Sequence, residues 1–216
     1  MKRFREPVSG VTHLIGAILS LVGLIALLYI AINQGSILHL ISFIVFGVSL
    51  ILLYLASSIY HLVPGPKKVI LLLRKIDHMM IFILIAGSYT PFLLVALDGF
   101  WRWGMLTGIW IIAVSGVVFK AFWINAPRWL YTAIYLGMGW LALVVIAPLI
   151  RALPVGAIVW LFLGGAFYTI GAVFYALKWP NPIPKIFGFH EIWHIFVLLG
   201  SFSHFWSVFK YVSLIK

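Results

Sequence analysis

The sequence contains no cysteine and only four acidic residues among its 216 positions. Without cysteine the chain has no disulfide bonds and no thiolate metal sites, so a bound metal needs histidine, carboxylate or neutral oxygen ligands. Charged residues make up 9% of the chain and hydrophobic residues 64%, whereas a soluble domain is about a quarter charged. With a mean hydropathy of +1.17, this composition predicts an integral membrane protein.

The shortage of acidic residues leaves a formal net charge of +11. A basic balance can indicate a nucleic-acid partner. Here, however, the basic residues form short clusters between apolar runs, which is typical of membrane topology and of contact with anionic lipid headgroups. We therefore expect membrane lipids as partners and no nucleic acid. The first apolar run is long and has no small-residue cleavage site after it, so we expect a retained helix and no signal peptide.

Seven apolar runs are long enough to cross the hydrocarbon core, which needs about 20 helical residues. The connections between them are short and leave no room for a soluble domain. The sequence therefore predicts an all-α seven-transmembrane helix bundle that forms one membrane domain over residues 1–216. The expected helices cover residues 11–32, 37–62, 76–97, 103–123, 129–150, 155–177 and 190–212.

The orientation follows from the distribution of the 15 Lys and Arg residues, because cytoplasmic loops are rich in these residues. With the N-terminus inside, the inner segments contain Lys2, Arg3, Arg5, Lys67, Lys68, Arg74, Lys75, Lys120, Arg128, Lys178 and Lys185. The outer segments contain only Arg102, Arg151, Lys210 and Lys216. We therefore expect a cytoplasmic N-terminus, an external C-terminus and a location in the cell membrane.

Three histidines and one carboxylate fall at the predicted inner ends of three different helices. His61 ends the second helix, Asp77 begins the third, and His190 and His194 begin the seventh, one turn apart on one face. His194 lies only about 6 Å deeper than His190, given the helical rise per residue. Ionisable residues inside a membrane are costly and usually functional, so this shared depth predicts a metal site near the cytoplasmic face.

Three imidazoles with an open fourth position are typical of catalytic zinc. Asp77 would then either bind the ion directly or hold its water and act as a general base. Ser57 lies one turn before His61, and its hydroxyl could orient the water or stabilise an oxyanion. Ser57 could equally be a small polar residue that serves helix packing.

The remaining histidines fit this zinc site less well. His13 and His78 lie near the same depth and could contact the site from outside or meet lipid headgroups. His39 lies at the outer side, and His204 lies roughly 15 Å deeper than His194. We expect both of these to be hydrogen-bonded packing residues.

Three other functions are compatible with parts of this pattern. Residues 190–194 match the H-E-x-x-H pattern of zinc proteases, with Glu191 as base. This interpretation leaves His61 and Asp77 unexplained, and Glu191 lies about 100° around the helix from His190. A membrane-state sensor with a structural zinc would need a closed site, with Asp77 as a fourth ligand. A pore-forming or lytic protein would not need the histidines.

The sequence resembles the hemolysin III family, the bacterial branch of the superfamily that contains the adiponectin and progestin receptors. The resemblance extends over nearly the whole chain, in the order and spacing of its motifs. One departure is Ser9, where the family has asparagine. The motifs are Glu6–His13, Ser57–His61, Asp77–His78, Ala86–Phe92 and His190–His204.

This resemblance implies a seven-helix bundle with the N-terminus inside and a zinc ion held by His61, His190 and His194. It implies that Asp77 contacts the zinc-bound water, with Ser57 nearby. The receptors resemble alkaline ceramidases at this site, which implies hydrolysis of a lipid amide or ester linked to membrane-lipid homeostasis. A lipid substrate or fatty acid is then expected in the bundle cavity.

Overall fold

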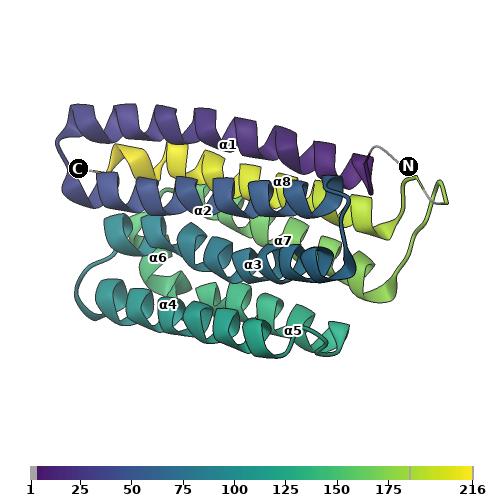
Figure 1. The fold of residues 1–216 in the computed structure, drawn as a ribbon. Coiled ribbons are helices and arrows are strands. Elements are labelled where there is room, and N and C mark those ends of the chain that lie inside the picture. The colour runs from purple at the N-terminus through teal and green to yellow at the C-terminus, as the bar shows by residue number, and fades with distance from the viewer. Residues whose placement is uncertain (1–3, 185, 216) are drawn as a thin grey trace.

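The computed structural model describes residues 4–184 and 186–215. Within these residues, seven helical spans are long and apolar enough to cross a membrane, which confirms the predicted all-α bundle (Figure 1). Lys2, Arg3, Lys185 and Lys216, used above for orientation, lie outside the described residues. The elements are α1 (Pro7–Gln34), α2 (Ile37–Leu62), α3 (Lys67–Ala96), α4 (Gly99–Phe122), α5 (Arg128–Trp140), η1 (Leu141–Val145), α6 (Ile146–Ala152), α7 (Val155–Leu177), α8 (Phe189–Lys210) and η2 (Val212–Leu214).

Helices α1, α3 and α4 begin at least four residues earlier than the hydrophobic pattern predicts. Helix α3 starts at Lys67 instead of near residue 76, because residues 67–75 (KKVILLLRK) contain no Gly or Pro that would break the helix. Helix α1 starts at Pro7, since proline has no N–H and suits the first helical position. Helix α2 ends before Pro64, where the chain turns toward α3.

The fifth span is interrupted, where the sequence predicts a continuous helix over residues 129–150. Helix α5 gives way to the 3₁₀ segment η1 before α6. Pro148 lies in α6 and cannot donate to the carbonyl four residues before it, which weakens the α-helical ladder here. The Tyr89 hydroxyl lies 2.9 Å from the Met138 carbonyl and 2.6 Å from the Gly139 carbonyl, so these groups keep a partner inside the membrane.

Helix α3 lies at the centre of the bundle. It packs against α2, α4, α5 and α8. In its most apolar stretch 67% of the residues are buried, compared with 22% in the corresponding stretch of α4. Helix α1 exposes a broad apolar face that includes Ile18, Leu19 and Val22. Such a face suits lipid contact, because lipid tails are as apolar as these side chains.

The ends of three helices meet at one end of the bundle. The start of α1, the end of α2 and the start of α8 lie there, while the C-terminus lies at the opposite end (Figure 1). At the start of helix α8 the Glu191 side chain reaches back to cap the helix, and its carboxylate accepts a hydrogen bond from the Gly188 N–H at 2.9 Å. This end of the bundle contains the histidines of the predicted metal site.

Candidate metal site

The structure brings His61 together with His190 and His194, although His61 lies at least 129 residues before either of them in the chain. One nitrogen from each ring lies within 4.8 Å of the others, which could hold a metal ion. The ring centroid of His61 lies 4.9 Å from the ring centroids of both His190 and His194, which are themselves 4.7 Å apart. His61 and His194 are buried, and His190 is partly buried.

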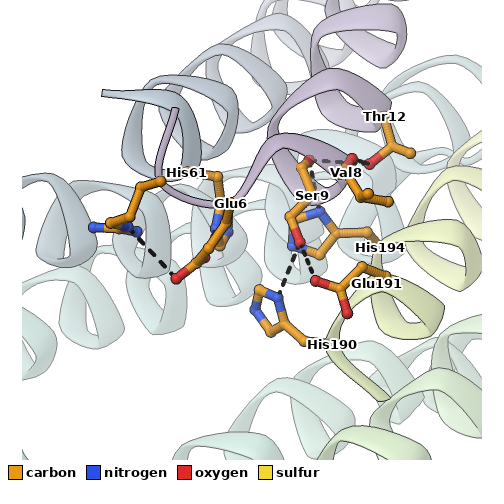
Figure 2. A network of polar contacts seen from close by, with 9 residues as sticks. Glu6, Val8, Ser9, Thr12, His61, His190, Glu191 and His194 are labelled. Carbon is orange, nitrogen blue, oxygen red and sulfur yellow. Dashed lines mark hydrogen bonds and ion pairs between the residues drawn. The ribbon is translucent and has the colours of Figure 1, made fainter. Parts of the chain in front are cut away.

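His61 has one satisfied and one free ring nitrogen. Its Nδ1 donates to a carboxylate oxygen of Glu6 (Figure 2). Its Nε2 is buried and has no hydrogen-bond partner among the described residues. A buried polar atom without a partner is costly, and a metal ion bound to the three histidines would remove this cost. The donor set therefore fits zinc, which binds neutral imidazole nitrogen.

Glu6 lies just before α1, with its side chain 45% exposed. The hydrogen bond from His61 lowers the pKa of Glu6 below its ordinary value, against the opposing effect of partial burial. The Arg5 guanidinium, 3.5 Å from the other carboxylate oxygen, acts in the same direction. Glu6 is therefore a carboxylate at neutral pH.

The predicted catalytic residues Asp77 and Ser57 both line a cavity that His190 and His194 also line. Asp77 is 8% exposed and Ser57 is 2% exposed. Asp77 does not belong to the cluster of ligand atoms that the three histidines form among the described residues. It lies beside the cluster, from a third helix.

The cavity has a volume of about 160 Å³ and extends from the histidine cluster to His204. Most of its wall is apolar and comes from α3, α5, α7 and α8. It also reaches Trp140 and Phe162, which are 39% and 41% exposed on the bundle surface. The Trp140 indole donates to the Thr169 hydroxyl at 3.1 Å, which links α5 to α7 at this place.

The other histidines have different surroundings. His13 is buried and stacks on His194, with ring centroids 3.7 Å apart. His78 lines the cavity and packs near Tyr131. His39 bonds to Ser36 at the opposite end of α2. His204 contacts the Leu161 carbonyl at 3.2 Å. None of these four belongs to the cluster within the part of the chain that the structure describes.

Reasoning from the residues alone missed Glu6 and Ser9, which contact the histidines directly. The Ser9 hydroxyl lies 3.3 Å from Nδ1 of His190, and the Ser9 carbonyl lies 3.2 Å from Nδ1 of His194. The depth of a residue along its helix does not show which neighbouring helix its side chain contacts. The one signal for these two residues was the Glu6–His13 motif at the start of the first helix.

Fold and cluster together define a multi-pass membrane protein with a buried set of histidines that could hold a metal ion. The chain belongs to the family described as "Haemolysin-III related", whose family model matches residues 1–205. It is 42% identical to "Hemolysin-3 homolog" of Bacillus subtilis (strain 168) over 206 residues, which cover 95% of this chain and 93% of that protein. It is also 42% identical to "Hemolysin-3" of Bacillus cereus over 207 residues, covering 96% and 91%.

A more distant similarity extends to animal proteins. The chain is 28% identical to "Monocyte to macrophage differentiation factor" of Homo sapiens over 179 residues, which cover 78% of this chain and 69% of that protein. The match agrees with the superfamily that the motifs indicate.

Proposed function

We propose that the protein is a zinc-dependent membrane hydrolase of lipid amide or ester bonds, with a role in membrane-lipid homeostasis. The observation that carries this proposal is the histidine cluster at one end of an apolar cavity. The start of α1 lies at the same end of the bundle as the end of α2 and the start of α8 (Figure 1), and from the positions of Lys and Arg we propose that this end faces the cytoplasm at the cell membrane.

His61, His190 and His194 would hold the zinc ion. When bound, zinc is a Lewis acid that makes water a nucleophile at neutral pH. Asp77, which lines the cavity beside the cluster, accepts the proton of the attacking water. It then delivers this proton to the leaving nitrogen or oxygen as the acyl bond breaks. The Ser57 hydroxyl donates to the oxyanion that develops on the scissile carbonyl.

The cavity wall supports a lipid substrate. It is mainly apolar, as an acyl chain requires, and Asp77, His190 and His194 are among its polar groups. Its partly exposed members Trp140 and Phe162 lie within membrane spans, so they face the lipid phase. We propose that an acyl chain enters between α5 and α7, and that the scissile bond then reaches the histidines.

The protease alternative requires Glu191 to act as a general base at the metal. One Glu191 oxygen accepts from the Gly188 N–H at 2.9 Å. The other accepts from the Ser9 hydroxyl at 2.8 Å, as Figure 2 shows. A carboxylate used in these two bonds caps a helix and orients a serine. This arrangement favours Asp77 over Glu191 as the base.

Metal analysis of the purified protein tests the site. We expect about one zinc per chain, as in other three-histidine sites, and loss of that zinc in His190→Ala. His39→Ala is the matched control, because His39 is also a buried intramembrane histidine but lies at the other end of α2. Full zinc retention in His190→Ala would contradict the site.

Release of fatty acid from ceramide and ester substrates in lipid nanodiscs tests the reaction. We expect release by the zinc-loaded protein and not by His190→Ala. Zinc binding without release from either substrate class would instead favour a sensor with structural zinc. Ion flux in vesicles that survives loss of the histidines would favour a pore.

A further inference from the structure

We propose that Glu6 and Ser9, at the start of α1, are positioning residues that hold all three histidines in one tautomer with Nε2 free for the metal. This inference rests on the proposed zinc site. We call Glu6 and Ser9 the N-terminal clamp. Neither residue belongs to the cluster of ligand atoms, yet each contacts at least one of its histidines (Figure 2).

Glu6 holds His61 by two separate bonds. Its carboxylate accepts a hydrogen bond from His61 Nδ1, and its backbone N–H donates to the His61 carbonyl at 2.9 Å. Arg5 supports the carboxylate from the other side and lies over the Tyr60 ring at 4.2 Å. Because an ionised carboxylate only accepts hydrogen bonds, the proton of neutral His61 must be on Nδ1.

The Ser9 hydroxyl sets the tautomer of His190. Its single hydrogen is donated to the Glu191 carboxylate at 2.8 Å, so its oxygen can only accept from His190 Nδ1, 3.3 Å away. The capping bond from Gly188 fixes the other Glu191 oxygen. Glu191 therefore acts on His190 through Ser9.

The Ser9 backbone sets the tautomer of His194. The Ser9 carbonyl accepts from His194 Nδ1 at 3.2 Å, and a carbonyl cannot donate. The Thr12 hydroxyl lies 3.0 Å from the same carbonyl and 2.9 Å from the Val8 carbonyl, which stabilises this first turn of α1 (Figure 2). All three Nδ1 atoms are thus donors to one short segment, and all three Nε2 atoms are left with a lone pair.

Groups of this kind orient metal-binding histidines and raise their basicity, and their loss usually lowers metal affinity about 10–100-fold. Ser9, in the first turn of α1, is fully buried where this helix contacts α8. The clamp therefore makes α1 part of the metal site, although α1 contributes no ligand to the cluster of described residues.

The test compares Glu6→Gln and Ser9→Ala with the wild-type chain, all at full length in detergent. Zinc affinity is measured by competition with a chromophoric chelator, and the visible absorption of the cobalt-substituted protein reports ligand geometry. We expect each variant to bind zinc about 10–100-fold more weakly and to shift the cobalt absorption bands. Glutamine keeps the shape of Glu6 but not its charge.

Two matched controls separate the clamp from general effects. Asp98→Asn removes another carboxylate paired with arginine, at the opposite end of the bundle. Ser20→Ala removes another buried hydroxyl of α1, which donates to the Gly16 carbonyl within its own helix. Both controls should keep the wild-type zinc affinity and cobalt spectrum.

Three results would decide against the inference. Unchanged zinc affinity and cobalt spectra in both clamp variants would overturn it while leaving the zinc site intact. A lower melting temperature of the metal-free variants with unchanged affinity would show a purely structural role and also overturn it. A wild-type chain that binds no zinc would overturn the zinc site together with the clamp, whereas zinc binding without hydrolysis would leave the clamp standing.

Discussion

The position of Asp77 relative to the metal distinguishes the two main proposals, a hydrolase and a sensor with structural zinc. Asp77 lines the cavity together with His190 and His194 but is absent from the ligand cluster of the described residues. In the proposed mechanism Asp77 contacts the attacking water without binding the metal itself. A closed structural site would instead use a fourth protein ligand.

Replacing Asp77 by asparagine should therefore leave zinc content unchanged and lower the rate of lipid hydrolysis about 10²–10⁴-fold, the usual contribution of a general base. Zinc content and fatty-acid release are measured on the same preparation. Asp98→Asn is the control, because Asp98 pairs with Arg102 on the surface. Loss of zinc in Asp77→Asn would make Asp77 a ligand and favour the sensor.

At the same scale, the sequence predicted the histidines better than their partners. Depth along a helix follows from the helical rise, so His61, His190 and His194 could be placed together before the structure was known. Glu6, Ser9 and the stacking of His13 on His194 depend on how α1 crosses α2 and α8. Crossing geometry comes from side-chain packing, which hydropathy does not contain.

At the scale of helices, close packing depends on small residues where two helices approach. A Cβ added to Gly116 of α4 would overlap the ring of Phe82 in α3, and Phe82 is fully buried. By contrast, a Cβ added to Gly108 of the same helix would have no atom within 4 Å. The two glycines therefore differ in their surroundings and not in their helix.

Gly116→Ala should lower the stability of the protein by about 1–3 kcal/mol, the usual cost of overpacking a filled core. Gly108→Ala should be neutral or slightly stabilising, since alanine favours helix more than glycine does. Thermal unfolding of the detergent-solubilised proteins measures both. Equal melting temperatures for the two variants would contradict the packing of α3 against α4.

Hydropathy predicted the seven spans because each must cover the hydrocarbon core, but it could not predict the break between α5 and α6. That break depends on Pro148 and on the Tyr89 hydroxyl, which lies within hydrogen-bond distance of the carbonyls of Met138 and Gly139. The early start of α3 at Lys67 was also missed, since the basic residues on both sides of Val69–Leu73 interrupt the apolar run without interrupting the helix.

For the molecule as a whole, the histidine cluster and the cavity behind it have separable roles in the proposed function. The cluster comes from α2 and α8 and is contacted by the start of α1, whereas much of the apolar wall comes from α3, α5 and α7. A side chain that fills the apolar part should therefore block the lipid and leave the metal in place. Gly165 of α7 offers such a position, because it lines the cavity and a Cβ there would have no atom within 4 Å.

Gly165→Phe is expected to retain zinc and the cobalt spectrum of the wild type while the amount of co-purified lipid and the rate of hydrolysis both fall. Mass spectrometry of lipids extracted from the purified protein measures the first effect. Gly137→Phe is the control. A Cβ added to Gly137 would also have no atom within 4 Å, and Gly137 is exposed on α5, but it does not line the cavity. If the Gly165 variant carried and cleaved lipid like the control, the acyl chain would not occupy this cavity. Loss of zinc from the Gly165 variant would instead show that the wall and the metal site are one structural unit.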